Sequence, residues 1–218
     1  MQFVDKGIAP IELQNWISAN KGMPNCQFKY LEGGVKEVIR DRLLSEQFYI
    51  CCYTGLRLSV NNNHIEHLIP QSDSLARNMP LETVEYKNMV VCNNSEEFGA
   101  RYKADWPSST EVHLFVKPVD PTCRTRFVYK KNGKVEAMDT DAAATTTIEK
   151  LNLNHPKLSK LRLDAINNLF LFPPKKDVDY RKFVRNSIGR FSTPVDGKYH
   201  EFSFVLTQIL TKKLNSLK

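Results

Sequence analysis

The 218-residue sequence predicts an α+β fold, with a strand-rich centre between two helical ends. Apolar residues recur at helical spacing near the start and through the last third, as in amphipathic helices. Short apolar and aromatic runs separated by glycine and asparagine turns occupy the middle, which is typical of strands. We therefore divide the chain into a helical segment 1–48, a strand-rich core 49–140 and a helical region 141–218.

Two helices are expected in the first segment. Residues 10–17 have a proline at the helix start and place Leu13 and Trp16 on one face. A second helix is expected after Gly33-Gly34, because a stripe of apolar residues follows at helical spacing. The stripe consists of Val35, Val38, Ile39, Leu43 and Leu44. Such stripes usually face the core.

The centre of the chain is expected to contain short strands. Residues 48–53 and 56–60 predict a hairpin across a Thr-Gly turn, and residues 89–91 predict a second buried segment. A helix is expected to start at Ser95, because a serine N-cap followed by two acids suits a first turn. Residues 112–116 predict another strand.

The last third of the chain begins with the clearest hairpin. Residues 126–129 and 135–138 flank a Lys-Lys-Asn-Gly turn, which favours two antiparallel strands. Helices are expected in the remainder of the chain. Their predicted ranges are 142–152, 156–171, 177–189 and 199–215.

The run His64-Ile65-Glu66-His67, followed 21 residues later by Asn88, carries the most chemical information. Phosphodiester hydrolysis needs a divalent metal that polarises the scissile phosphate and holds the leaving oxygen, and a general base that takes a proton from water. Glu66 can supply an oxygen ligand to a hard metal such as Mg²⁺. His67 can take the proton, and an amide such as Asn88 can fix the loop that carries His67.

This order of acid, histidine and asparagine resembles the signature of HNH endonucleases, which have a ββα-metal fold. Residues 50–58, 64–72 and 86–92 are similar to the HNH subunit of Septu-type anti-phage systems, the PtuB family. Members of that family are also effectors of some retron systems. The resemblance covers roughly residues 9–172. It implies that residues 49–140 form an HNH nuclease core with a following β-hairpin.

The resemblance also implies a function and a partner. The chain is expected to hydrolyse phosphodiester bonds in nucleic acid as the nuclease subunit of an ATPase-coupled defence complex. Invading phage DNA is the favoured substrate. The resemblance implies an ABC or SMC-like ATPase of the PtuA type as the partner. This chain has no Walker loop, so any ATP dependence must come from elsewhere. The region 141–218 is the expected docking surface. Two alternatives remain open: a retron effector that cleaves tRNA or other RNA, and a non-catalytic assembly subunit with a degenerate site.

Within this pattern His67 is the expected general base and Asn88 is the residue that orders its loop. Glu66 is the expected ligand of a Mg²⁺ or Mn²⁺ ion. His64 is also expected at the site, where it supports Glu66, contacts phosphate or only forms local hydrogen bonds. We expect His64 and His67 to share one cleft.

The third position of the signature departs from the family pattern, because no histidine follows Cys92 before His113. Glu97, nine residues after Asn88, is the expected second metal ligand, and Asn93 and Asn94 are nearer alternatives for this position. Glu97 could equally be a simple first-turn acid. Arg101 and Lys103 on the same expected helix are candidates for contacts with nucleic-acid phosphates. Their alternative role is that of solvated surface cations.

Composition agrees with a nucleic-acid partner and gives a location. The net charge of +7 and the isoelectric point near 9.1 favour polyanions. The N-terminus lacks a basic-then-apolar signal pattern, and no apolar run approaches the roughly 18 residues of a membrane span. Five cysteines without a regular framework suit a reducing compartment. We expect a cytoplasmic protein without a membrane contact.

The cysteines also bear on structural zinc, which many HNH proteins bind through two Cys-x-x-Cys pairs. Thr54 follows Cys52 two positions later, and no cysteine follows Cys92 before Cys123. These thiols do not complete a tetrahedral four-cysteine site. We therefore expect no complete structural zinc site, and core packing in its place.

Overall fold

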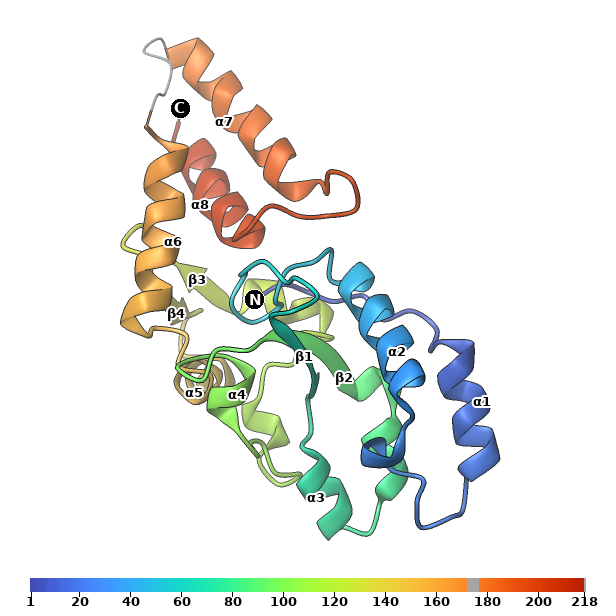
Figure 1. Ribbon diagram of the computed structural model, residues 1–218. Coiled ribbons are helices and arrows are strands. Elements are labelled where there is room, and N and C mark those ends of the chain that lie inside the picture. Colours follow the sequence, from blue (N-terminus) through green and yellow to red (C-terminus); the bar gives the residue numbers. More distant parts are fainter. Residues whose placement is uncertain (172–176, 218) are drawn as a thin grey trace.

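The structure is a computed structural model that describes residues 1–171 and 177–217 (Figure 1). Helices α1 (Ile11–Asn20) and α2 (Gly33–Glu46) come first, and α1 lies outside α2 in the view of Figure 1. Leu13 of α1 and Leu43 of α2 are buried, and α2 packs against the central sheet. Both expected N-terminal helices are therefore confirmed.

The central sheet consists of β1 (Asn63–His67) and β2 (Met89–Asn93), which are antiparallel and lie in the middle of the molecule (Figure 1). All five residues of β2 are buried. Side chains alternate between the two faces of a strand, so His64 and Glu66 point to the face opposite that of His67. The sheet therefore separates the two histidines of the motif.

Three short helical segments connect β1 to β2. They are α3 (Gln71–Ala76) and the 3₁₀ helices η2 (Pro80–Val84) and η3 (Tyr86–Asn88). α3 and η2 pack against each other. Within the described part of the chain, no helix combines the length and the apolar character needed to cross a membrane.

The hairpin expected across residues 48–60 is wrong. Only a single β-bridge forms in this stretch of the described chain, between Ile50 and Arg57. Phe48 and Tyr49 have φ angles of 48° and 58°, so the backbone turns where an extended strand was expected. The partner of β1 is thus β2 rather than the segment that precedes β1.

The Gln47 side chain connects this turning segment to the sheet. Its amide nitrogen donates to the carbonyl oxygens of Ile50 at 3.1 Å and Val91 at 2.8 Å. Its amide oxygen accepts a hydrogen bond from the Val91 backbone N–H at 2.6 Å. A buried polar side chain satisfied in this way fixes the segment against β2.

The helix expected from Ser95 starts later, as the four-residue α4 (Ala100–Lys103). The Ser95 hydroxyl accepts a hydrogen bond from the Glu97 N–H at 3.2 Å, which closes a local turn instead of starting a helix. Gly99 then has a φ of 84°, which is incompatible with helix continuation. Position 99 is therefore the boundary at which α4 begins.

The strand expected at residues 112–116 is also wrong. The chain forms the 3₁₀ helix η4 (Val112–Leu114) there instead. The backbone N–H of Val116 donates to the Thr147 hydroxyl at 2.9 Å rather than to a neighbouring strand. This side-chain partner satisfies the buried N–H without a sheet.

The C-terminal third agrees with expectation. β3 (Phe127–Tyr129) and β4 (Val135–Ala137) form the antiparallel hairpin. Four helices follow, with ends that differ from the predicted ranges by a few residues. They are α5 (Ala142–Lys150), α6 (Pro156–Leu169), α7 (Asp177–Ser192) and α8 (Ser203–Ser216). α7 and α8 pack against each other, and α8 also contacts β3.

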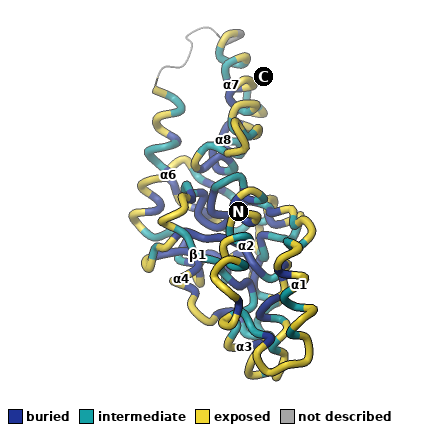
Figure 2. Tube along the Cα trace, turned by 45° about the vertical axis from the view of Figure 1, so that its right-hand side comes forward, coloured by how far each residue is buried: buried dark blue, intermediate teal, exposed yellow. Residues whose placement is uncertain are grey.

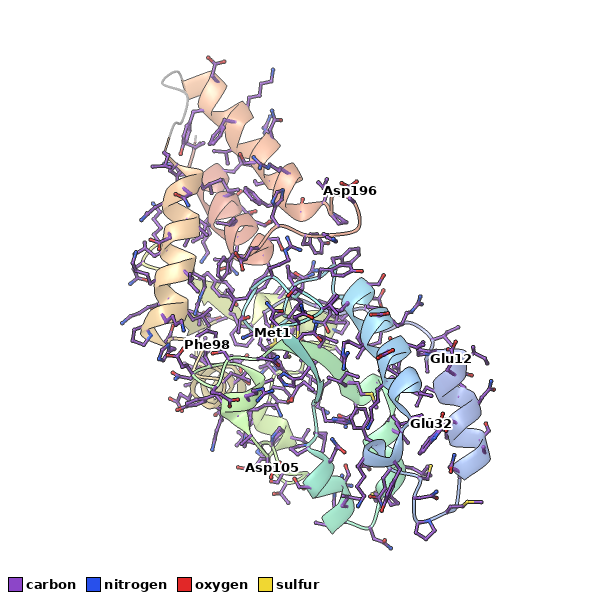
Figure 3. The ribbon with its side chains drawn as sticks, in the orientation of Figure 1. Met1, Glu12, Glu32, Phe98, Asp105 and Asp196 are labelled. Carbon is purple, nitrogen blue, oxygen red and sulfur yellow. The ribbon has the colours of Figure 1, made fainter. Side chains whose placement is uncertain are left out.

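One hydrophobic core draws on all three predicted segments. Leu13, Val90 and Leu206 belong to the same buried cluster. Met1 and Phe98, labelled in Figure 3, are also part of it. Figure 2 shows this buried interior surrounded by the exposed outer faces of the helices. The central sheet is thus supported from both ends of the chain.

Gly133 in the β3–β4 turn provides a test of this packing. Its φ is +81°, and an added Cβ would lie 2.0 Å from the Ser159 carbonyl oxygen of α6. We expect Gly133→Ala to lower the free energy of unfolding by about 3 kcal/mol, from left-handed strain and overpacking together. Gly22→Ala is the matched control, since Gly22 has a φ of +86° with nothing within 4 Å. Urea denaturation that gave equal losses for both variants would contradict the close approach.

Candidate active site

Glu66 and His64 meet on one face of β1. The Glu66 Oε2 atom lies 3.7 Å from His64 Nε2, and both side chains are largely buried. His64 Nδ1 lies 2.9 Å from Asn94 Oδ1. Because an amide oxygen only accepts hydrogen bonds, Nδ1 carries the hydrogen in this contact. Asn94 therefore orients the His64 ring toward the Glu66 carboxylate.

Lys103 completes this cluster from α4. Its Nζ atom lies 2.6 Å from Glu66 Oε1, and its side chain is only 1% exposed. The ammonium also donates to the carbonyl oxygens of Trp106 at 2.8 Å and His67 at 3.3 Å. The expectation that Lys103 meets a nucleic-acid backbone from an exposed helix is therefore corrected, because the side chain points inward to a buried carboxylate.

His67 lies on the other face of β1, so the expectation of a cleft shared with His64 is wrong. Its Nε2 atom is 2.8 Å from the Thr83 carbonyl oxygen, so Nε2 carries the hydrogen and the neutral ring keeps a lone pair on Nδ1. Phe28 packs edge-on against the ring. Burial lowers the pKa of His67 below the ordinary histidine value, although the Thr83 carbonyl and Glu66 oppose this shift. His67 is thus a neutral, oriented imidazole, the form that a general base requires.

The buried His67 ring should make stability depend on pH. Because its pKa is lowered in the folded state, the unfolded chain binds the proton first as the pH falls. Stability should therefore be complete above about pH 6.5 and decrease below it, until the folded ring is protonated as well. We expect the urea midpoint to fall more between about pH 7.5 and about pH 5.5 in the wild type than in His67→Gln. An equal pH dependence of the two proteins would contradict this assignment.

Asn88 connects the end of β1 to the start of β2. Its Oδ1 atom accepts from the Ile69 N–H at 2.8 Å, and its Nδ2 atom donates to the Ile69 carbonyl oxygen at 3.0 Å. The Asn88 carbonyl oxygen accepts from the Leu68 N–H at 2.8 Å. These three hydrogen bonds hold the segment that directly follows His67.

Glu97 and Arg101 lie in surface ion pairs. Glu97 Oε2 is 2.8 Å from Lys157 Nζ, and this hydrogen bond lowers the pKa of the Glu97 carboxyl group. Arg101 Nη1 is 2.6 Å from Glu96 Oε1. In residues 1–171 and 177–217 no three His, Cys, Asp or Glu side chains form a group that could hold a metal ion. The structure thus does not unite Glu97 with Glu66 in such a group.

Sequence reasoning missed two contributors to this region, Gln71 and Thr83. Gln71 Nε2 lies 3.4 Å from His67 Nδ1, four residues along the chain. Thr83 orients His67 through its backbone carbonyl. Asn94, an alternative for the third position of the signature, instead orients His64. The short spacing from His67 could have pointed to Gln71. A backbone acceptor such as Thr83 leaves no side-chain signal in the sequence.

HNH nucleases generally use a divalent metal, and the side chains around Glu66 are the place where this chain could hold one. Glu66 and His64 are two suitable donors. The second carboxylate oxygen, however, is already next to the Lys103 ammonium at 2.6 Å. A divalent ion there would lie beside a buried positive charge, which is unfavourable. This donor set, as arranged, does not fit a divalent metal.

Comparison with known proteins identifies a relative of this chain. No family model matches the chain. Over 167 residues the chain is 28% identical to a protein of Vibrio cholerae serotype O1 biovar El Tor named "Retron Vc95 putative HNH endonuclease". The match covers 73% of this chain and 80% of that protein. The similarity therefore extends over most of both chains.

Proposed function

We propose that this protein is an HNH-type endonuclease that hydrolyses phosphodiester bonds in nucleic acid. The observation that carries the proposal is the His67 ring, whose Nε2–H is held by the Thr83 carbonyl so that Nδ1 is free of hydrogen. The antiparallel pair β1 and β2, followed along the chain by the short helix α4, supports this proposal. The similarity to a retron-named HNH endonuclease supports the same reaction class.

In the proposed reaction His67 Nδ1 takes a proton from water. The water oxygen then bonds to phosphorus as the bond between phosphorus and the leaving sugar oxygen breaks, and solvent protonates that oxygen. Gln71 lies near Nδ1 at 3.4 Å, longer than an ordinary hydrogen bond, so a water molecule can replace it with a shorter contact. Asn88 holds the segment after His67 in position throughout.

The expected biological setting is anti-phage defence. The relative is named for a retron, which favours a retron effector over a Septu subunit and leaves DNA and tRNA as candidate substrates.

A non-catalytic assembly subunit is the second candidate function. Two ion pairs favour it. Glu66 is paired with the buried Lys103, and Glu97, the other expected metal ligand, is paired with Lys157.

We also propose that an ABC or SMC-like ATPase encoded beside this chain is its partner. The docking surface expected in region 141–218 is limited to the outer faces of its helices, because Val184 of α7 and Ile209 of α8 are buried. Co-purification of the two tagged chains tests this partner. Recovery of neither chain with the other would contradict it.

The test of function is cleavage of plasmid DNA and of total tRNA by the purified chain, with and without that ATPase. Parallel reactions contain Mg²⁺, Mn²⁺ or a chelator. Nicked plasmid would support a DNA nuclease, and shortened tRNA would support an RNA-cleaving effector. Intact polymers in every reaction, including those with the ATPase, would favour the assembly subunit.

A further inference from the structure

Lys103 is a buried cation surrounded by oxygen atoms of three residues. Its hydrogen bonds go to the carbonyl oxygens of Trp106 and His67, and its charge lies 2.6 Å from Glu66 Oε1. That carboxylate oxygen is buried and accepts no directed hydrogen bond, so the contact is primarily ionic. The ammonium thus has the oxygen environment that a small bound cation would have.

A divalent ion at Glu66 would have to displace this ammonium or bind beside it. Displacement would leave the two buried carbonyl oxygens that accept from Lys103 without a hydrogen-bond donor, which costs free energy. Binding beside it would place like charges within a few ångströms of each other in a buried site. Both routes weaken metal binding at the carboxylate.

We propose that Lys103 is the internal cation of this site and that its ammonium excludes a divalent metal from Glu66. Any cleavage reaction would then proceed without a divalent metal at Glu66. This consequence for cleavage rests on the proposed nuclease function. The exclusion of metal does not, because it can be measured without nucleic acid.

Calorimetric titration of Mn²⁺ into three proteins tests the inference. They are the wild type, Lys103→Met, and the double variant Glu66→Gln/Lys103→Met, which serves as the blank for binding elsewhere on the surface. We expect the wild type to bind no more tightly than the blank. Lys103→Met should bind at least about tenfold more tightly than the wild type, because a competing charge at 2.6 Å is removed.

Two results would overturn the inference. One is wild-type binding of Mn²⁺ that clearly exceeds that of the double variant, because Glu66 would then accept the metal despite Lys103. The other is a folded Lys103→Met protein that binds no better than the blank, because Lys103 would then not be what excludes the ion. If Lys103→Met does not fold, the comparison of wild type with blank still decides the first point. A failed cleavage assay would leave these binding results unchanged.

Discussion

Replacing His67 with alanine should lower the rate of phosphodiester cleavage by roughly 10²–10⁴-fold, the usual contribution of a general base. The reason is local, because Thr83 holds the Nε2–H and leaves Nδ1 as the proton acceptor. His155→Ala is the matched control, since His155 is a partly buried histidine that lies next to Glu97 instead. The measurement is the initial rate of cleavage on whichever polymer the wild type cuts.

The pH profile of that cleavage gives a second, independent readout of the same residue. Because burial lowers the pKa of His67, the unprotonated base should persist below the pH at which an ordinary histidine is protonated. The acid limb of the rate profile should therefore lie below about pH 6.5.

His64 is the rival base on the opposite face of β1, next to Glu66. Loss of cleavage in His64→Ala with full cleavage in His67→Ala would transfer the role to it. In that case the reacting phosphate would lie on the Glu66 face of the strand. Circular dichroism of both variants must show the wild-type fold for this comparison to hold.

The elements that could be predicted from sequence are those whose signal is local and periodic. The four C-terminal helices and the β3–β4 hairpin have this character, and all of them form. The strand expected at residues 48–53 does not form, although it is rich in aromatic residues. Phe48 and Tyr49 instead take positive φ angles in a turn that Gln47 fixes against β2. That outcome depends on a contact 44 residues away in sequence.

The candidate site shows the same division between local and distant information. The adjacent pair Glu66-His67 and the later Asn88 could be proposed as site residues from short motifs. In the structure the Asn88 side chain forms two hydrogen bonds with Ile69. Lys103 could not be placed in this way. In sequence it is one cation on an expected surface helix, whereas the late start of α4 turns it inward toward Glu66. Only the packing of the whole core determines that direction.

Glu66→Gln should destabilise the fold by about 3–5 kcal/mol, the usual cost of leaving one partner of a buried ion pair unpaired. The remaining ammonium is 1% exposed, so water cannot solvate it. Lys103→Met should cost less, because the Glu66 carboxylate is 13% exposed and His64 lies 3.7 Å from it. The double variant should recover most of the loss, since no buried charge is then left unpaired.

Urea denaturation of the four proteins at neutral pH gives the coupling free energy between the two side chains. Glu97→Gln is the matched control for removal of a paired carboxylate, because the Glu97–Lys157 pair is solvent-exposed and should contribute far less. If Glu66→Gln cost no more than Glu97→Gln, the Lys103 ammonium could not lie buried against Glu66. If the single losses simply added in the double variant, the two side chains would act independently. A large favourable coupling instead would establish the internal ion pair whether or not the protein cleaves nucleic acid, because unfolding is measured without substrate.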